Sequence, residues 1–324
     1  MMSNFTYVRP ESLQQAISHL ATAGARAHAG GTDLLGCLRD ELFSASKIVS
    51  LSGLEGLHGI KKTTGGGLRI GALTTIAEIA AHETVQERFT ALADAAAEVA
   101  SPQLRNQGTL GGNLCQKPRC WYYRGEFHCL RKGGDTCYAI SGENQYHCIF
   151  GSHECCIVHP SDTAPALVAL DATARIDGPA GQRDVKLADF YVLPAVDVQR
   201  ETVLEPGEIV TEILLPPPPG GLRSGYSKVR ARGSWDFALA SVALALRFEG
   251  GNISAAKVVL GGAAPIPWRT KEVEEVIIGS NLDTATIGRA AAAVVAQAEP
   301  LGKNEYKIPL FQGLLEQELL AMRG

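Results

Sequence analysis

Two short stretches, 29-AGGTDLLG-36 and 108-GTLGGN-113, each place adjacent glycines beside a threonine and a carboxylate or amide side chain. A loop that binds phosphate needs glycines because its backbone N–H groups must approach the anion without an intervening Cβ atom. Neither the dinucleotide fingerprint G-x-G-x-x-G nor the P-loop pattern G-x-x-x-x-G-K-[ST] occurs in the chain. The sequence therefore lacks the main signals of a Rossmann NAD site and of a Walker NTPase, and ordinary turns remain the alternative for each glycine pair.

Charge and length limit the function classes. The 324 residues include 30 Lys and Arg against 34 Asp and Glu, a formal charge of −4, which gives no electrostatic footprint for nucleic acid or an anionic membrane. The N-terminal stretch has no signal-peptide pattern, and the longest apolar run, 237–246, is too short to span a bilayer. We expect a cytoplasmic protein of two or three domains or subdomains, with no nucleic-acid or membrane partner.

Cysteine is unevenly distributed along the chain. Seven of the eight cysteines lie between Cys115 and Cys156, and this segment has neither a helical nor a strand period. We therefore expect an irregular insert that something other than a hydrophobic core must order.

The spacing of these cysteines favours an iron–sulfur cluster over the alternatives. No C-x2-C pair occurs, which disfavours a zinc ribbon or finger, and disulfides suit secreted chains. A cluster needs four thiolates that a long loop can bring together. Zinc and unligated thiols remain open, and we expect the histidines of the insert (His128, His147 and His153) to be surface or packing residues rather than ligands.

Hydrophobic patterns and turn residues indicate the remaining organisation. Residues 216–221, with four consecutive prolines, predict a linker. Within 7–22, the apolar pattern at Leu13, Ala16, Ile17 and Leu20 predicts a helix with Ser12 near its N-cap. We also expect two helices within 76–100, and helices after 161, at 284–298 and at 309–322. We expect strands at 47–51, 68–73, up to 176, 224–229, 237–248 and 253–260, and a polar loop at 101–114.

Five motifs occur in order along the chain: AGGTDLL at 29–35, IGALTTIAEI at 70–79, TLGGN at 109–113, HPSDTAPAL at 159–167 and YSKVRARGSWDFALASVA at 226–243. Together they resemble the FAD-binding medium subunits of the xanthine oxidase family of molybdenum hydroxylases. The resemblance covers nearly the whole chain. The insert after Asn113 is similar to that of the beta subunits of 4-hydroxybenzoyl-CoA reductases, with the flavin subunits of periplasmic-type aldehyde oxidoreductases as close relatives.

The resemblance implies an α+β fold with two parts. The first is a PCMH-type (vanillyl-alcohol-oxidase-like) FAD-binding domain at 1–217, divided into subdomains 1–56 and 57–217 and carrying the iron–sulfur insert at 115–158. The second is a C-terminal α+β domain at 222–324, like that of CO dehydrogenase flavoproteins.

The resemblance also implies which residues bind FAD. The two glycine loops would hold the diphosphate through backbone N–H groups, Asp162 would accept hydrogen bonds from the flavin or ribityl side, and Lys228 would place a cation nearby. Without the resemblance, Asp162 reads as a helix N-cap and Lys228 as an exposed strand lysine. The full predicted set is Ala29, Gly30, Gly31, Thr32, Asp33, Leu34, Leu35, Gly36, Ser101, Gln103, Thr109, Leu110, Gly111, Gly112, Asn113, Asp162, Val210 and Lys228.

For a [4Fe-4S] cluster the resemblance favours Cys120, Cys129, Cys137 and Cys155. It leaves Cys115, Cys148 and Cys156 as spectators, although the adjacent Cys156 makes the last ligand ambiguous by one residue. Cys37, outside the insert, is expected to be an ordinary buried thiol.

The implied function is electron transfer, with no catalytic residue on this chain. A ferredoxin-like donor would reduce the [4Fe-4S] cluster, and electrons would pass through FAD to a small [2Fe-2S] subunit and a large molybdenum subunit, which converts 4-hydroxybenzoyl-CoA to benzoyl-CoA. The expected assembly is a dimer of heterotrimers. The alternative is the same architecture working oxidatively, in an aldehyde or xanthine-type dehydrogenase; a stand-alone flavoenzyme and a zinc-stabilised interaction module are the other classes.

Overall fold

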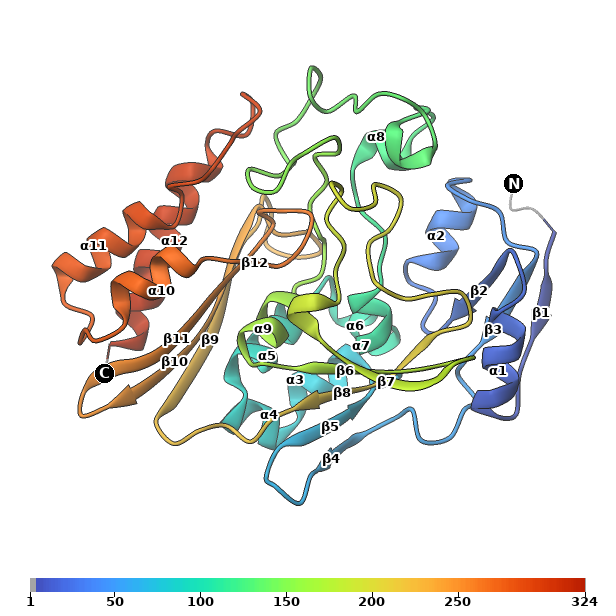
Figure 1. Ribbon diagram of the computed structural model, residues 1–324, viewed down its shortest axis with the longest axis horizontal. Coiled ribbons are helices and arrows are strands. Elements are labelled where there is room, and N and C mark those ends of the chain that lie inside the picture. Colours follow the sequence, from blue (N-terminus) through green and yellow to red (C-terminus); the bar gives the residue numbers. More distant parts are fainter. Residues whose placement is uncertain (1–3, 324) are drawn as a thin grey trace.

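The structure is a computed structural model that describes residues 4–323. Residues 1–3 and 324, which the predicted domain limits include, lie outside the described residues. These residues form a mixture of helices and three separate sheets, which agrees with the predicted α+β class (Figure 1).

The N-terminal sheet is small and parallel. Its order is β1 (Thr6–Val8), β3 (Lys47–Ser50), β2 (Ala25–His28). Helix α1 (Leu13–Leu20) begins at the predicted cap, where the Ser12 side chain accepts a hydrogen bond from the N–H of Gln15. The loop after β2 leads into α2 (Leu34–Arg39), so the first glycine loop lies between a strand and a helix.

The central sheet is antiparallel and has five strands. Its order is β4 (Ile60–Lys62), β5 (Leu68–Gly71), β8 (Ile209–Leu215), β6 (Thr173–Gly178), β7 (Gly181–Lys186). Its apolar side chains share one core with those of the helices that follow β5 and with α9. These helices are α3 (Ile76–Ala81), α4 (Glu83–Arg88), α5 (Thr90–Glu98), α6 (Pro102–Gln107), α7 (Leu110–Leu114) and α9 (Thr163–Ala169).

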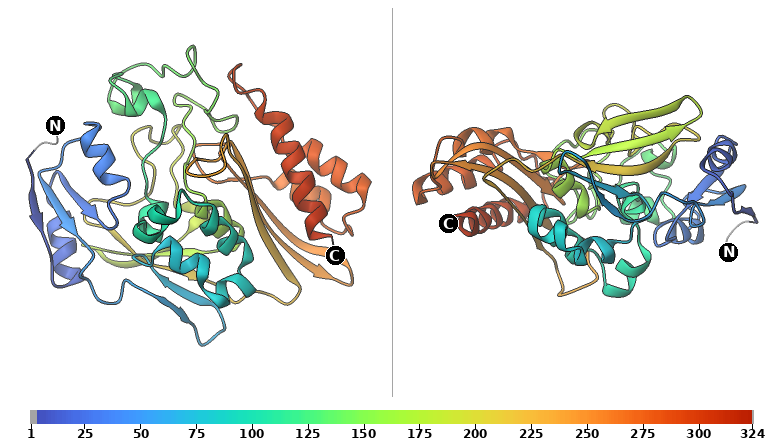
Figure 2. Two further views of the ribbon diagram at one scale, coloured as in Figure 1. Left: turned by 180° about the vertical axis from the view of Figure 1, so that it is seen from behind. Right: turned by 90° about the horizontal axis from the view of Figure 1, so that it is seen from below.

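The C-terminal sheet lies between two layers of helices. Its order is β12 (Trp268–Arg269), β11 (Asn252–Gly261), β10 (Ala240–Glu249), β9 (Leu222–Val229), all antiparallel. Its outer layer is α10 (Lys271–Ile277), α11 (Thr284–Ala293) and α12 (Lys307–Met322), as the views in Figure 2 also show. Along β10, Val242 and Leu244 belong to the core under these helices, whereas Ala243 and Ala245 belong to the core of the central sheet. Burial on both faces explains why this strand is apolar without alternation.

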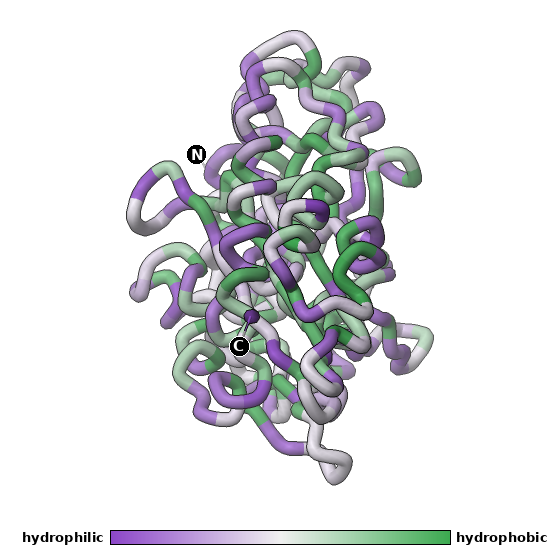
Figure 3. The backbone as a smooth tube through the Cα atoms, turned by 90° about the vertical axis from the view of Figure 1, so that its left-hand side faces the viewer, coloured by the Kyte–Doolittle hydropathy of each residue, from purple (hydrophilic) through white to green (hydrophobic). Residues whose placement is uncertain are grey.

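The insert lies above the sheets, between the N-terminal part and the C-terminal helices (Figure 1). Apart from α8 (Trp121–Arg124) and a single 3-10 turn at Leu130–Lys132, residues 115–158 form no helix or strand, as expected. Figure 3 shows the apolar segments running through the middle of the molecule, with hydrophilic segments in most outer loops. Within residues 4–323, no helix is long and apolar enough to cross a membrane.

Several element predictions were wrong. Residues 101–114 form α6 and α7 rather than a loop, because Ser101 and Thr109 act as N-caps; their side chains accept hydrogen bonds from the N–H groups of Leu104 and Gly112. Residues 76–98 form three helices rather than two, and β4, β7 and α10 were not predicted. Residues 216–221 form no helix or strand, as expected of a linker, and they connect the central and C-terminal sheets.

Candidate functional site

The two glycine loops, far apart in the sequence, lie against each other. The Nε2 of Gln107 donates to the carbonyl oxygen of Gly30 at 3.3 Å. A Cβ atom on Gly30 would lie only 2.0 Å from the carbonyl oxygen of Gln107. The close approach of the loops therefore requires glycine at position 30.

The first loop has the geometry expected of an anion-binding turn. Gly31 has a φ of +73°, a conformation that favours glycine. Within the described chain, the backbone N–H groups of residues 30–33 donate no hydrogen bond, so they are available to a ligand. Because orphaned N–H groups of this kind bind phosphate well, this loop fits a diphosphate-binding role.

The second loop differs in this respect. The N–H groups of Leu110 and Gly111 donate to the carbonyl oxygens of Thr74 and Ala72, at 2.9 and 2.8 Å. The N–H of Gly112 donates to the Thr109 hydroxyl at 3.2 Å. These three groups are engaged within the protein, and diphosphate binding through them stays a prediction.

Two adjoining cavities, of about 600 and 280 Å³, lie along the loops. The larger is lined by the predicted residues Gly31, Thr32, Asp33, Leu35, Gly36, Thr109, Gly112, Asn113 and Asp162. The smaller is lined by the predicted residues Ala29, Gly30, Gly31, Thr32, Asp33, Leu34, Thr109, Gly111, Gly112 and Val210. Cavities of this size are typical of cofactor sites. Four predicted residues line neither cavity: Ser101, Gln103, Leu110 and Lys228.

Asp162 and Lys228 form a buried ion pair beside the larger cavity. The Lys228 Nζ lies 2.7 Å from the Oδ2 of Asp162, and the two side chains are 0% and 6% exposed. Tyr226 donates its hydroxyl to the Oδ1 of Asp162 at 2.8 Å. Burial raises the pKa of Asp162, while Lys228 opposes this shift. Lys228 is therefore not an exposed strand lysine, and Asp162, although it stands at the N-cap position of α9, makes no capping hydrogen bond.

Asp33 joins the first loop to the insert. Its Oδ1 accepts from Arg124 at 2.8 Å and lies 2.9 Å from Arg119, and its Oδ2 accepts from the N–H of Lys117 at 2.8 Å. Burial opposes ionisation, but these two arginines lower the pKa of Asp33 overall. Both oxygens of the Asp33 carboxylate therefore bind groups of the insert.

The insert gathers the four predicted ligands around one space. Cys120, Cys129, Cys137, Cys155 and also Cys156 line it. Each of the eight cysteines of the sequence is a free thiol. Cys115 and Cys148 do not line this space, and Cys37 is fully buried.

The thiols interact closely. Hydrogen bonds from Cys155 and Cys156 lower the pKa of Cys137, whereas burial raises the pKa of Cys120 to about 11. The thiol of Cys156 also forms a hydrogen bond with the thiol of Cys148. The space between the thiols is about 10 Å³, and among residues 4–323 no group of three or more His, Cys, Asp or Glu is arranged to hold a metal ion.

Comparison with known families identifies the fold. Residues 3–218 match the family described as "FAD binding domain in molybdopterin dehydrogenase", and residues 225–322 match "CO dehydrogenase flavoprotein C-terminal domain". The chain belongs to this family of molybdopterin dehydrogenase FAD-binding subunits.

Relatives of this FAD-binding subunit cover all or nearly all of its length. The aldehyde oxidoreductase FAD-binding subunit PaoB of Escherichia coli K12 is 38% identical, over 100% of this chain and 99% of PaoB. The glyceraldehyde dehydrogenase medium chain of Sulfolobus acidocaldarius is 31% identical, over 91% and 89%. CO dehydrogenase from Oligotropha carboxidovorans, a solved structure, has a TM-score of 0.78, with 25% identity over 100% of each chain.

The family assignment confirms the predicted fold, the oxidoreductase class and FAD as cofactor. The comparisons give no evidence for the 4-hydroxybenzoyl-CoA reductase identity, and they support the oxidative alternative better.

The residues present fit both predicted groups in part. For FAD, the free N–H groups of residues 30–33 and the two cavities provide a cradle. For a cluster, the donors fit because thiolates are its usual ligands. The space between the thiols is too small for a cluster, so binding one would require the cysteine side chains to turn outward. These cysteines stand on loops rather than in a rigid sheet.

His147, expected to be a surface or packing residue, is a buried packing residue with its Nε2 3.2 Å from the Sγ of Cys120. Two residues with positive φ that line the larger cavity were not predicted. Ala100 and Trp235 line the larger cavity, and both have positive φ, 45° and 53°. The N–H of Trp235 donates to the carbonyl oxygen of Ala100 at 3.1 Å. Strained backbone of this kind gathers at ligand sites, but composition and spacing do not reveal it.

Proposed function

We propose that this chain is the FAD-binding electron-transfer subunit of an aldehyde-oxidising molybdenum hydroxylase, with an additional [4Fe-4S] cluster in its insert. The observation that carries the substrate class is the full-length similarity to an aldehyde oxidoreductase FAD-binding subunit, at 38% identity. A second relative, at 31% identity, belongs to a glyceraldehyde dehydrogenase.

Within this proposal, residues 1–217 form the FAD-binding domain, with subdomains 1–56 and 57–217, and residues 222–324 form the C-terminal domain. The first glycine loop holds the diphosphate through its free N–H groups. The Asp162–Lys228 pair supplies the polar groups beside the flavin cavity. Bound FAD supplies a centre that exchanges one or two electrons.

The proposed cluster ligands are Cys120, Cys129, Cys137 and Cys155. Their gathering around one space, within an insert that otherwise lacks regular structure, supports this assignment. A third cavity, of about 190 Å³, extends from Cys120 and His147 to Asp162 and Phe237. Cys120 and His147 also line the space between the thiols, and Asp162 and Phe237 also line the larger cavity beside the glycine loops. The cluster and the flavin would therefore be near neighbours.

The aldehyde site belongs, in this proposal, to a large molybdenum subunit, with a small [2Fe-2S] subunit completing a heterotrimer that forms dimers. The names of the relatives, "FAD-binding subunit" and "medium chain", support a multi-subunit enzyme.

The substrate class is tested with the native complex, co-purified through a tag on this chain. We expect turnover of aromatic aldehydes with an artificial electron acceptor. Reductive dehydroxylation of 4-hydroxybenzoyl-CoA with a reduced ferredoxin, without aldehyde turnover, would overturn the proposal in favour of the reductase.

The cluster is tested by metal analysis of the same complex and of this chain separated from it. We expect about four iron and four acid-labile sulfide per chain, by the composition of a [4Fe-4S] cluster. Stoichiometric zinc without iron would refute the cluster but leave the FAD assignment in place. Replacement of Cys129 by serine should remove iron while FAD is retained.

A further inference from the structure

Arg131 is a buried cation at the wall of the cysteine space. Its side chain is 1% exposed, and it lines the same space as Cys155. Its Nη1 donates to the Oε1 of Glu201 at 2.6 Å and to the carbonyl oxygen of Arg200 at 3.4 Å. Lys132, the next basic residue, points elsewhere and donates to the carbonyl oxygen of Gly125.

Among residues 4–323, two of the donor atoms of Arg131 have no oxygen or nitrogen partner. The Nε and Nη2 atoms are buried and make no hydrogen bond of normal geometry. The guanidinium does interact with the Cys155 thiol. Leaving a buried donor without a partner is unfavourable, so two of them on one side chain require an explanation.

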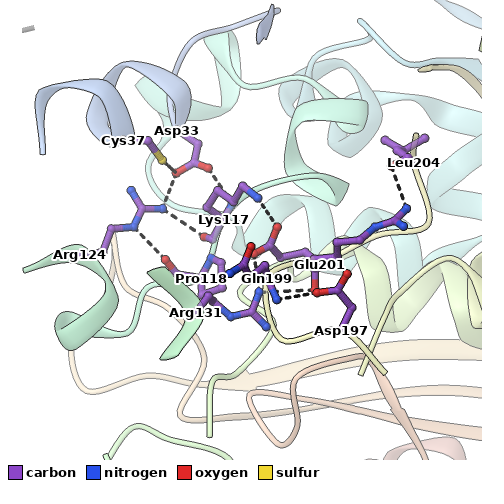
Figure 4. Close-up of polar contacts among 11 residues, drawn as sticks. Asp33, Cys37, Lys117, Pro118, Arg124, Arg131, Asp197, Gln199, Glu201 and Leu204 are labelled. Carbon is purple, nitrogen blue, oxygen red and sulfur yellow. Dashed lines mark hydrogen bonds and ion pairs between the residues drawn. The ribbon is translucent and has the colours of Figure 1, made fainter. Parts of the chain in front are cut away.

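Glu201 pairs with this arginine and, through Lys117, connects it to Asp33 of the first glycine loop (Figure 4). The other carboxylate oxygen of Glu201 pairs with Lys117, and the N–H of Lys117 donates to Asp33 of the first glycine loop. Glu201 is 8% exposed. The network holds Arg131 through its Nη1, because a carboxylate constrains a planar guanidinium.

We infer that Arg131 is a positioning residue for the cluster: it donates Nε–H and Nη2–H to sulfur atoms of the cluster and of Cys155, and thereby raises the cluster's reduction potential. This inference rests on the proposed cluster. It assigns a function to the two unpaired donors, since sulfur acceptors at this place would satisfy both.

The expected sign follows from electrostatics. A reduced cluster carries one more negative charge, so a nearby buried cation and N–H donors to sulfur stabilise it relative to the oxidised cluster. The carboxylate of Glu201 offsets part of this effect. Removing the arginine charge should therefore lower the potential, and removing the glutamate charge should raise it.

The test uses the native complex with Arg131→Gln, Arg131→Lys and Glu201→Gln, titrated with redox mediators and followed by low-temperature EPR. At a fixed solution potential we expect Arg131→Gln to lower the ratio of reduced to oxidised cluster at least tenfold, equivalent to 59 mV for one electron. Arg131→Lys should give a smaller decrease because it keeps the charge but not the planar donors. Glu201→Gln should increase the ratio.

Arg200→Gln is the matched control, since Arg200 is a neighbouring arginine whose side chain is 37% exposed and pairs with Glu205. We expect no change in the ratio there, because solvent screens that charge. Iron and sulfide content is measured in every variant.

The outcomes separate the two proposals. Wild-type complex without iron and sulfide would refute the proposed cluster, and the inference with it. A full cluster whose potential is the same in Arg131→Gln as in wild type would overturn the inference alone. If Arg131→Gln fails to hold a cluster, Glu201→Gln decides, and an unchanged or lowered potential there would overturn the inference.

Discussion

Replacing Lys228 by methionine should destabilise the protein more than any exposed lysine replacement. Its ammonium group and the carboxylate of Asp162 lie 2.7 Å apart with almost no exposure to solvent. The methionine side chain has a similar length, so packing is nearly preserved while the positive charge is lost. What remains is an uncompensated carboxylate whose other side-chain partner, within residues 4–323, is the Tyr226 hydroxyl.

Removal of one partner of a buried pair costs about 3–5 kcal/mol, whereas replacement of both by neutral groups is close to neutral. We therefore expect Lys228→Met to lower the free energy of unfolding by about 3 kcal/mol at pH 7. The double variant with Asp162→Asn should lie within about 1 kcal/mol of the wild type. Because a whole domain is stable by only about 5–15 kcal/mol, the single change is large.

The free energy of unfolding is measured by urea denaturation of the purified subunit after removal of FAD, so that lost cofactor binding does not mix with lost stability. Lys257→Met serves as the control, since Lys257 pairs with Asp171 at the surface, with side chains 23% and 56% exposed. Its loss should be below about 1 kcal/mol.

The pH dependence gives a second check on Lys228→Met. Burial already raises the pKa of Asp162, and loss of Lys228 raises it further. The folded state then binds a proton more readily than the unfolded state, so the defect should shrink as the pH falls from 7 to 5. Equal losses in the single and double variants, or a defect independent of pH, would show that charge compensation is not the role of the pair.

Three further predictions concern the glycine loops, a buried histidine and the insert. Gly30→Ala should abolish FAD retention with iron content unchanged, because its Cβ would meet the carbonyl oxygen of Gln107, whereas Gly288→Ala, with open space around it, should bind FAD normally; the flavin absorbance per chain decides. Burial lowers the pKa of His159 to about 3, so the folded state favours the neutral imidazole. Its contribution to the free energy of unfolding should be complete above pH 6.5 and should fall by about 1.4 kcal/mol per pH unit below that. A His159→Phe variant that loses stability in acid as steeply as the wild type would contradict this. Cys148→Ser should keep its iron, and iron loss there would make Cys148 a ligand.

Local signals in the sequence predicted some of these elements well. Ser12 before an amphipathic pattern located α1, and the prolines at 216–219 located the break between two sheets. The same cap chemistry at Ser101 and Thr109 would have predicted α6 and α7, but the glycines nearby outweighed it in the sequence interpretation. Polar composition is therefore a weaker guide than a capping residue when the helices are only one or two turns long.

The site was predictable only where a motif is continuous in the sequence. The glycine loops could be recognised because their neighbours along the chain are also their neighbours in space. Lys228 and Asp162 are 66 positions apart, and Arg131 and Glu201 are 70 positions apart. No period or spacing links such residues, so their pairing follows only from the tertiary structure.

Ion pairs join the first glycine loop to the insert. Asp33 belongs to the loop that fits the FAD diphosphate, yet Arg119 and Arg124, which bind its carboxylate, come from the insert. From the same insert, Lys117 pairs with Glu201, which orients Arg131 at the cysteine space. Because each of these ion pairs is at least partly buried, a change at either end disturbs the other through uncompensated charge rather than through distance alone. A change that removes one of these charges should therefore affect the loading of both cofactors, whereas Gly30→Ala and Cys129→Ser leave the ion pairs in place and should each affect only one.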